Sequence, residues 1–228
     1  MTAELCIVMP VLDEAERLAD ALRALQPLRR RGAIVVVVDG GSSDDSLAIA
    51  RGAADVAVSA PRGRASQMNA GAQACASRVL LFLHADTRLP EDADAIVARA
   101  TATHAWGRFD VQLDSPRPLL RVVAAAMNLR SRLTGIATGD QALFARRDVF
   151  VAAGGYPDIA LMEDIALSRR LKRLGPPARL RERVRTSARR WERHGAWRTI
   201  WLMWRLRAAY AIGADPARLA KRYGSAPR

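Results

Sequence analysis

Residues 33–44 read AIVVVVDGGSSD, and this stretch decides the fold class. The β-branched run Ala33–Val38 is typical of a strand that is covered on both faces. Asp39–Ser42 is a cluster of turn-forming residues. Asp44-Asp45-Ser46 then offers a cap and first-turn anions for a helix. The stretch therefore predicts a strand, a carboxylate-bearing loop and a helix in succession.

The same succession is repeated along the chain. In the first half we expect strands at Leu5–Met9, Ala54–Ser59 and Val79–Leu83, with helices over about 14–28 and 65–76. In the second half we expect strands at Val111–Leu113 and Gln141–Phe144, and helices over 119–133, 163–174 and about 196–212. This rhythm predicts an α/β fold with a mainly parallel sheet and helices on both faces. Ligands bind beyond the carboxyl ends of such strands, where the loops Pro10–Glu14, Asp39–Asp44 and His84–Thr87 should converge.

Charge is distributed unevenly along the 228 residues. Residues 1–164 hold 18 Lys and Arg against 20 Asp and Glu, a net charge of −2. Residues 165–228 hold 18 against 3, a net charge of +15, which should attract a phosphate or an anionic membrane surface. We predict one domain over residues 1–190 and a basic, Trp-rich helical extension over residues 191–228 that packs on it.

The two cysteines and the apolar segments bear on where the protein works. Cys6 and Cys75 both lie in apolar stretches and form no CxxC pair, so we expect neither a disulfide scaffold nor a cysteine metal site. The N-terminus lacks the pattern of a signal peptide, and no apolar run approaches the roughly 18–20 residues of a membrane span. We therefore expect a cytoplasmic protein.

Further motifs follow the first strands, and together they resemble a known family. The motifs are Pro10–Glu14, Val38–Asp44, Leu83–Asp86, Thr138–Phe144, Gly154–Tyr156 and Met162–Asp164. In this order they resemble the family 2 glycosyltransferases of the GT-A (Rossmann-like) fold. The stretches Arg62–Ala72 and Thr186–Glu192 further resemble a bacterial subfamily associated with radical-SAM and selenoprotein-like domains and linked to arsenosugar synthesis. The resemblance covers nearly the whole chain and implies a glycosyltransferase of hexosyltransferase type.

The resemblance implies a nucleotide-sugar donor, with a UDP-sugar as the commonest choice in the family. The nucleotide-binding residues that it implies are Pro10, Glu14, Asp39, Gly41, Arg64 and Asp86. From the residues alone, Glu14 could simply begin a helix and Asp39 could cap a turn. Arg62 and Arg64 flank Gly63 and could either reach the diphosphate or be solvated at the surface.

The resemblance also implies a divalent cation, Mg²⁺ or Mn²⁺. The family usually has Asp-x-Asp at the fourth strand end, whereas this chain has His84-Ala85-Asp86. The second carboxylate, Asp86, is thus retained as metal ligand, and His84 becomes a candidate second ligand, since Mn²⁺ accepts imidazole. Alternatively, His84 contacts the ribose or diphosphate, or packs at the strand end.

A second set of residues is expected around the acceptor. Asp164 in the Glu163-Asp164 pair matches the family's catalytic base, which implies a direct displacement with inversion at the anomeric carbon. The alternative is a pair of carboxylates that only stabilise a helix start. We expect Asp140, Gln141, Arg190 and Trp191 on the acceptor or donor-sugar side. Trp191 could equally be a core anchor, and Ser187 replaces the glutamine of the processive motif.

Trp197, Trp201 and Trp204 recur at helical spacing near the C-terminus. Such a stripe packs on its own domain or on a second copy in a homodimer, or it contacts an anionic membrane on the inner face of the cell membrane. The acceptor would then be lipid-linked rather than a small molecule. The alternative hypothesis is a nucleic-acid- or anionic-membrane-binding protein that uses the basic C-terminal region and has a catalytically silent glycosyltransferase fold. The loop carboxylates would repel nucleic-acid phosphates, and no zinc-finger spacing is present, so we do not expect nucleic acid as partner.

Overall fold

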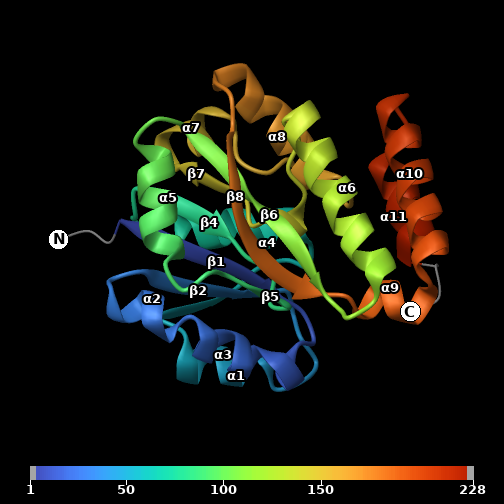
Figure 1. The fold of residues 1–228 in the computed structure, drawn as a ribbon. Helices are drawn as coiled ribbons and strands as arrows, with labels where there is room; N and C mark the ends of the chain where they lie inside the picture. The colour runs from blue at the N-terminus through green and yellow to red at the C-terminus, as the bar shows by residue number, and fades with distance from the viewer. Residues whose placement is uncertain (1–3, 225–228) are drawn as a thin grey trace.

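The computed structural model describes residues 4–224, without the side chains of Arg190 and His194. One eight-stranded sheet with the strand order β3-β2-β1-β4-β7-β6-β8-β5 runs through the molecule. Helices cover both faces of this sheet, and the last helices lie beside α6 at one side (Figure 1). The predicted α/β class is confirmed.

The strands are β1 Leu5–Val11, β2 Ile34–Asp39, β3 Val56–Ser59, β4 Val79–Phe82, β5 Thr87–Arg88, β6 Trp106–Asp114, β7 Phe144–Arg146 and β8 Ala178–Ser187. The helices are α1 Ala15–Ala24, α2 Gln26–Arg30, α3 Ser46–Ala53, α4 Arg64–Gln73, α5 Ala93–Thr101, α6 Pro118–Thr134, α7 Arg147–Ala152, α8 Glu163–Leu174, α9 Arg189–His194, α10 Ala196–Ala211 and α11 Pro216–Gly224, with one short 3₁₀ turn, η1 Gly139–Gln141.

The sheet is parallel in its first half and mixed in its second. β1 pairs in parallel with both β2 and β4, and β2 pairs in parallel with β3. β7 then runs antiparallel to β4 and to β6, whereas β6 and β8 are parallel to each other. The parallel half therefore brings the carboxyl ends of β1, β2 and β4 to one edge, as the sequence predicts.

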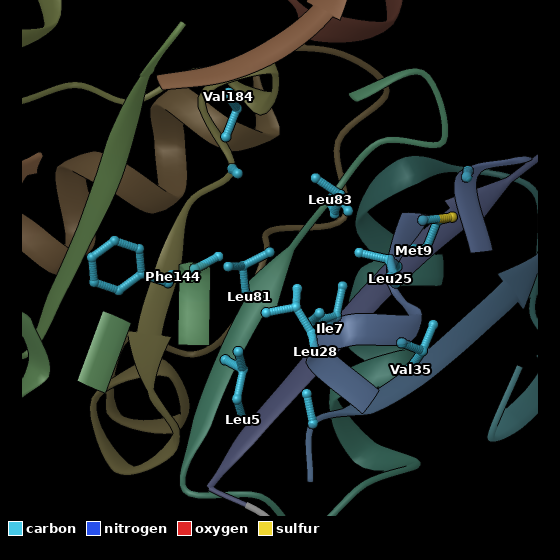
Figure 2. Packing of buried hydrophobic residues seen from close by; sticks show 14 of the residues in the cluster. Leu5, Ile7, Met9, Leu25, Leu28, Val35, Leu81, Leu83, Phe144 and Val184 are labelled. Atoms are coloured by element: carbon cyan, nitrogen blue, oxygen red, sulfur yellow. The ribbon is translucent and has the colours of Figure 1, made fainter. Parts of the chain in front are cut away.

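Alternate residues of the central strand serve two separate cores. Ile7 and Met9 of β1 belong to the first core, which α1, α2 and α5 cover (Figure 2). Cys6 and Val8 face the opposite side, where α4, α7 and α8 pack. Because both sides of β1 are buried, its sequence is continuously apolar rather than alternating.

Helix α4 lies unusually close to the sheet, because Gly71 faces β1 and β2. A Cβ atom at Gly71 would overlap the side chain of Val8 and would lie 2.8 Å from the Cγ2 atom of Val38. Glycine is disfavoured inside a helix, so its presence here is explained by this close approach.

Several elements differ from the sequence-based expectations. The expected helix 14–28 is two helices, because Pro27 begins a second one after the break at Leu25. The expected strand at 141–144 begins only at Phe144, since Gly139–Gln141 forms a 3₁₀ turn. Strand β8 is missing from the expectations, because its exposed positions are almost all arginine and hide the alternation.

The two cysteines are joined, against our expectation. The structure places a disulfide between Cys6 in β1 and Cys75 just after α4, across a sequence separation of 69 residues. That separation has no signature in the sequence, because the contact exists only once α4 is packed on the sheet. The pairing ties the end of α4 to the central strand.

The chain after β8 forms three helices that pack on the domain. Ala196 and Ile200 of α10 contact a cluster with Leu120 and Val123 of α6. Further along α10, Leu206 packs with Met162, and Leu219 of α11 joins the same cluster. Within the described residues, no helix is both long enough and apolar enough to cross a bilayer.

The close approach of α4 gives a test. Gly71→Ala should lower the free energy of unfolding by roughly 1–3 kcal/mol, because the added methyl group overpacks the contact with Val8 and Val38. Gly52→Ala is the matched control, since a Cβ there meets open space inside α3. This control should gain about 0.5–1 kcal/mol. Urea denaturation of both variants measures the difference, and equal effects would contradict the packing argument.

Candidate active site

A crevice of about 490 Å³ opens at the carboxyl ends of β1 and β4. It is lined by four of the predicted nucleotide-binding residues, Pro10, Glu14, Arg64 and Asp86, and by the metal candidate His84 and the catalytic candidate Glu163. Ala220 and Tyr223 of α11 contribute to the wall. A larger cavity of about 680 Å³ lies near the amino ends of the strands, beside Leu5 and Val79, away from these loops.

The loops after β1 and β2 hold each other in place. The backbone N–H of Asp13 donates to Ser42 Oγ at 3.0 Å, and that of Glu14 donates to Ser46 Oγ at 2.8 Å. In return, the backbone N–H of Ser43 donates to Asp13 Oδ1 at 2.8 Å. These reciprocal bonds fix Glu14 relative to the second loop.

Asp39 and Asp44 both organise their own loop. Asp39 is buried, and its carboxylate accepts the backbone N–H groups of Gly41 at 2.9 Å and Ser42 at 3.2 Å. Asp44 accepts the backbone N–H groups of Ser46 and Ala15. Hydrogen bonding with the Ser46 side chain, followed by that with the Ala15 N–H, lowers the pKa of Asp44. The turn and cap roles that the sequence left open are therefore present.

The stretch Arg62–Ala72 forms most of α4, and its polar side chains have defined contacts around the crevice. Gln67 is buried, and its side-chain nitrogen donates at 2.8 Å to the carbonyls of both Val11 and Val38. Asn69 pairs with both backbone groups of Tyr156, at 2.8 Å and 2.9 Å. These side chains connect the loops around the crevice, whereas Arg64, at the start of α4, projects among the crevice residues.

Asp86 is positioned by the short pairing of β5 with β8. Its backbone carbonyl accepts the N–H of Ser187 at 3.1 Å, and the hydroxyl of Thr87 donates to Asp86 Oδ1 at 3.2 Å. Thr87 also bonds to Thr186 of β8 at 2.9 Å. Burial, and next the charge of Asp86, raise the pKa of Glu14, which shows that the two carboxylates share one region of the crevice.

His84 pairs with Asp140 rather than with Asp86. Its Nδ1 atom lies 3.6 Å from Asp140 Oδ1, and a Cβ on Gly139 would come within 2.5 Å of the imidazole Cε1. Burial alone would raise the pKa of Asp140, but His84 and the arginines Arg64 and Arg207 lower it overall. His84 thus keeps Asp140 ionised and connects the Asp86 loop to the loop at residues 138–141.

Asp164 contacts the same loop at residues 138–141. Its Oδ2 atom accepts the backbone N–H of Gly139 at 2.8 Å, and its Oδ1 atom accepts that of Ile165 at 2.7 Å. Glu163 beside it is buried. Burial, followed by the charge of Asp164, raises the pKa of Glu163.

Backbone strain coincides with these residues. Within residues 4–224, the non-glycine residues with positive φ are Asp13 at 53°, Ala142 at 45° and Met162 at 70°. Each of them is adjacent in sequence to a predicted site residue, Glu14, Gln141 or Glu163. Such conformations cost about 1–3 kcal/mol and are concentrated at functional loops, so their positions support the site.

Two of the predicted acceptor-side residues have structural contacts. Gln141 is fully buried, and its side-chain oxygen accepts the backbone N–H of Thr138 at 3.2 Å. Trp191 packs against the cluster that contains Leu113 and Leu120. Neither residue is among those that line the crevice, and the side chain of Arg190 lies outside the described part of the structure.

Two arginines near Asp164 were not singled out from the sequence. Arg130 of α6 and Arg207 of α10 both have their pKa lowered, first by burial, and both feel the charges of Asp164 and Asp140. Arginine is so frequent in this chain that nothing in the sequence distinguishes these two. Only the packing of α10 beside α6 brings them to the site.

A comparison with known proteins identifies the family of this chain. Residues 6–147 match the model of the family described as "Glycosyl transferase family 2". The chain belongs to this family. The matched range contains Glu14, Asp39, Asp86 and Asp140. No curated protein sequence matches the chain.

Solved structures share the glycosyltransferase fold at low identity. A Pyrobaculum calidifontis mannosyltransferase, in complex with GDP-Man and Mn²⁺, aligns with a TM-score of 0.69 and 19% identity over 99% of this chain and 70% of its own. S. aureus TarS 1-349 with UDP-GlcNAc gives 0.65 and 15% over 81% and 58%. M. tuberculosis glucosyl-3-phosphoglycerate synthase, with Mn²⁺, UDP and glucosyl-3-phosphoglycerate, gives 0.56 and 17% over 82% and 70%. The chain thus spans about 58% of the length of the TarS segment.

The pKa of Glu163 makes a prediction about stability. Since its folded-state pKa is raised above 4.5, the unfolded chain loses this proton first as the pH increases. Wild-type stability should therefore fall relative to Glu163→Gln above pH 4.5, by about 1.4 kcal/mol for each unit of pKa shift. Urea denaturation of both proteins at pH 4.5 and pH 8 measures this difference. A difference that does not change with pH would refute the raised pKa.

Proposed function

We propose that the protein transfers a sugar from a nucleotide-sugar donor to an acceptor hydroxyl by a single displacement that inverts the anomeric carbon. The observation that carries this proposal is the continuous arrangement of carboxylates from Asp86, through Asp140, to Asp164. His84 connects the first two loops at 3.6 Å, and Gly139 connects the last two at 2.8 Å. Donor binding and proton removal then occur at opposite ends of one site.

The donor nucleotide would lie over the β1 and β2 loops. Glu14 and Arg64 line the crevice there, and Pro10 forms part of its wall. Asp39 and Gly41 would act through the shape of their loop, because the Asp39 carboxylate already accepts the Gly41 N–H. We favour a UDP-sugar by analogy with the family, while related structures hold either UDP or GDP donors.

The residues at the strand ends fit a divalent cation such as Mg²⁺ or Mn²⁺. Glu14 and Asp86 raise each other's energy when both are charged, as the pKa of Glu14 shows, and a cation would relieve this repulsion. Within the described residues no group of three or more His, Cys, Asp or Glu side chains could hold a metal alone. Asp86 would therefore hold the ion together with the donor diphosphate, and His84 would orient Asp140. When bound, the cation neutralises the leaving diphosphate.

Asp164 would serve as the general base. The acceptor oxygen attacks the anomeric carbon, its proton passes to Asp164, and the bond from that carbon to the diphosphate oxygen breaks. The backbone N–H groups of Gly139 and Ile165 hold the carboxylate in position, which preorganises it for this transfer. Burial and the charge of Asp164 raise the pKa of Glu163, so a second negative charge beside Asp164 is disfavoured.

We also propose the subfamily to which the protein belongs, and with it the class of acceptor. The roles of Gln67 and Asn69 show that the stretch Arg62–Ala72 builds the crevice. This supports membership of the radical-SAM- and selenodomain-associated subfamily, whose members are linked to arsenosugar synthesis. Within that proposal the sugar acceptor is a small molecule or a lipid-linked molecule.

Nucleotide binding gives the first test. Isothermal titration of UDP and GDP, with and without Mn²⁺, should show one nucleotide whose binding requires the metal. Asp86→Ala should weaken that binding by about ten-fold or more, because it removes a charged ligand of the cation. Asp20→Ala, an exposed carboxylate on α1, is the matched control and should bind as the wild type does. Absence of binding by either nucleotide would disprove the donor site.

The role of Asp164 is tested separately. Asp164→Asn should bind the nucleotide as well as the wild type, since the side chain lies at the acceptor end. Sugar transfer, or donor hydrolysis when water is the acceptor, should fall by roughly 10²–10⁴-fold, because the base is lost. Radiolabelled donor turnover measures both reactions. Full activity in this variant would exclude Asp164 as the base.

We also propose that α10 meets an anionic membrane. Trp197, Trp201 and Trp204 are 73%, 67% and 72% exposed, on the side of α10 opposite the buried Leu206. The exposed Leu133 of α6 adds a further apolar side chain on the neighbouring helix. Tryptophan faces surrounded by arginine favour the lipid interface, and the net charge of +15 in residues 165–228 suits anionic lipid.

Vesicle sedimentation tests the membrane contact. The wild type should bind phosphatidylglycerol vesicles and not phosphatidylcholine vesicles. Replacing the three exposed tryptophans of α10 by serine should weaken binding by about ten-fold or more, through loss of buried apolar area. Val151→Ser with Leu174→Ser, which changes exposed apolar residues elsewhere, should have no effect. Equal binding by both variants would place the contact elsewhere or show it to be purely electrostatic.

A further inference from the structure

Arg130 lacks the partners that buried guanidinium nitrogens normally have, and the half-buried Arg207 lies on the neighbouring helix α10. Arg130 has two buried nitrogens, Nε and Nη2, without a hydrogen-bond partner. Among the described side chains, no carboxylate forms an ion pair with either arginine within 4.0 Å. A desolvated guanidinium without a partner is costly and calls for an explanation.

The two arginines are also close enough to repel each other. Burial and then the charge of Arg207 lower the pKa of Arg130 to about 10. Arg108 adds to this repulsion, although its own charge is partnered by Asp110. Asp164 and Asp140 act on both arginines, but neither carboxylate forms an ion pair with them. Two neighbouring guanidinium groups without such a partner are suited to bind an anion.

Their position assigns the anion to the acceptor rather than to the donor. The charges that act on both arginines are those of Asp164 and Asp140, whereas Glu14 and Asp86 form the donor end of the crevice. Neither Arg130 nor Arg207 lines that crevice. Leu206, the neighbour of Arg207 on α10, packs with Met162, which precedes Glu163 and Asp164. The arginine pair is therefore near Asp164 but outside the donor crevice, and we assign the acceptor to this side.

We propose that Arg130 and Arg207 bind a phosphate group on the acceptor, next to the hydroxyl that receives the sugar. The two positive charges match the dianionic phosphate of a monoester, and guanidinium groups bind phosphate oxygens with strong directional hydrogen bonds. The proposal deepens the glycosyl transfer proposed above and rests on it. The phosphate belongs either to a soluble metabolite or to a lipid headgroup.

Direct binding tests this inference. Glycerol 3-phosphate and glycerol are titrated by calorimetry into the protein, alone and after saturation with the nucleotide and Mn²⁺. The phosphate compound should bind and glycerol should not. Arg130→Gln and Arg207→Gln should each weaken phosphate binding by about ten-fold or more, the loss expected for a charge-assisted hydrogen bond. Arg121→Gln, an exposed arginine on the same helix α6, controls for net charge and should bind within about two-fold of wild type.

A thermal shift measurement provides a second readout. Glycerol 3-phosphate should raise the melting temperature of the wild type and of Arg121→Gln, but not that of the two other variants. Without ligand, Arg130→Gln should be at least as stable as the wild type, because it removes an unpartnered buried charge. This result would show that a loss of binding is not a loss of fold.

A parallel titration distinguishes the two sources of the phosphate. Dihexanoyl phosphatidate is used below its micelle concentration. If it binds more tightly than glycerol 3-phosphate, the acceptor is a lipid, whereas equal affinity indicates a soluble acceptor. Binding that all three variants retain, or no binding of either phosphate compound, would overturn the inference. Failure of the glycosyltransferase proposal is recognised independently, as absence of nucleotide binding in the first titration.

Discussion

The site depends on one buried amide, that of Gln67. Its nitrogen donates to carbonyls at the ends of β1 and β2, those of Val11 and Val38, at 2.8 Å each. Buried carbonyls need hydrogen-bond donors. By satisfying both, Gln67 holds two loops in one register and anchors α4 over the sheet, where Gly71 permits the close approach. The positions of Glu14 and Arg64 both follow from this contact.

The first half of the fold could be predicted because its local signals agree with its tertiary structure. Ala33–Val38 is β-branched and buried on both faces, and Asp39 begins a loop that its own carboxylate closes. The convergence of three strand-end loops follows from the parallel pairing of β1 with β2 and β4. In the second half the strands pair with partners distant in sequence, and β8 carries arginines where an exposed strand usually carries mixed polar residues. No local sequence pattern predicts that strand pairing.

The candidate site, too, could be predicted from the sequence only in part. Carboxylates such as Asp86 and Asp164 are recognisable because they stand at strand and helix ends in a known order. The partner of His84 was not recognisable, because Asp140 meets it only when η1 is closed by Thr138 and Gln141. Arg130 and Arg207 are hidden among 36 basic residues, and only the crossing of α10 over α6 separates them from the rest. The Cys6–Cys75 pair was missed for the same reason, since a contact across 69 residues is a property of packing.

Helix α11 has a practical consequence for anyone who handles this enzyme. Ala220 and Tyr223 form part of the crevice wall, whereas β1 starts on the far side of the molecule (Figure 1). A fusion partner joined directly after α11 would therefore begin close to the crevice wall and could restrict access to it. A partner joined directly before β1 would begin on the opposite side. The choice of fusion site thus bears on any binding measurement at this crevice.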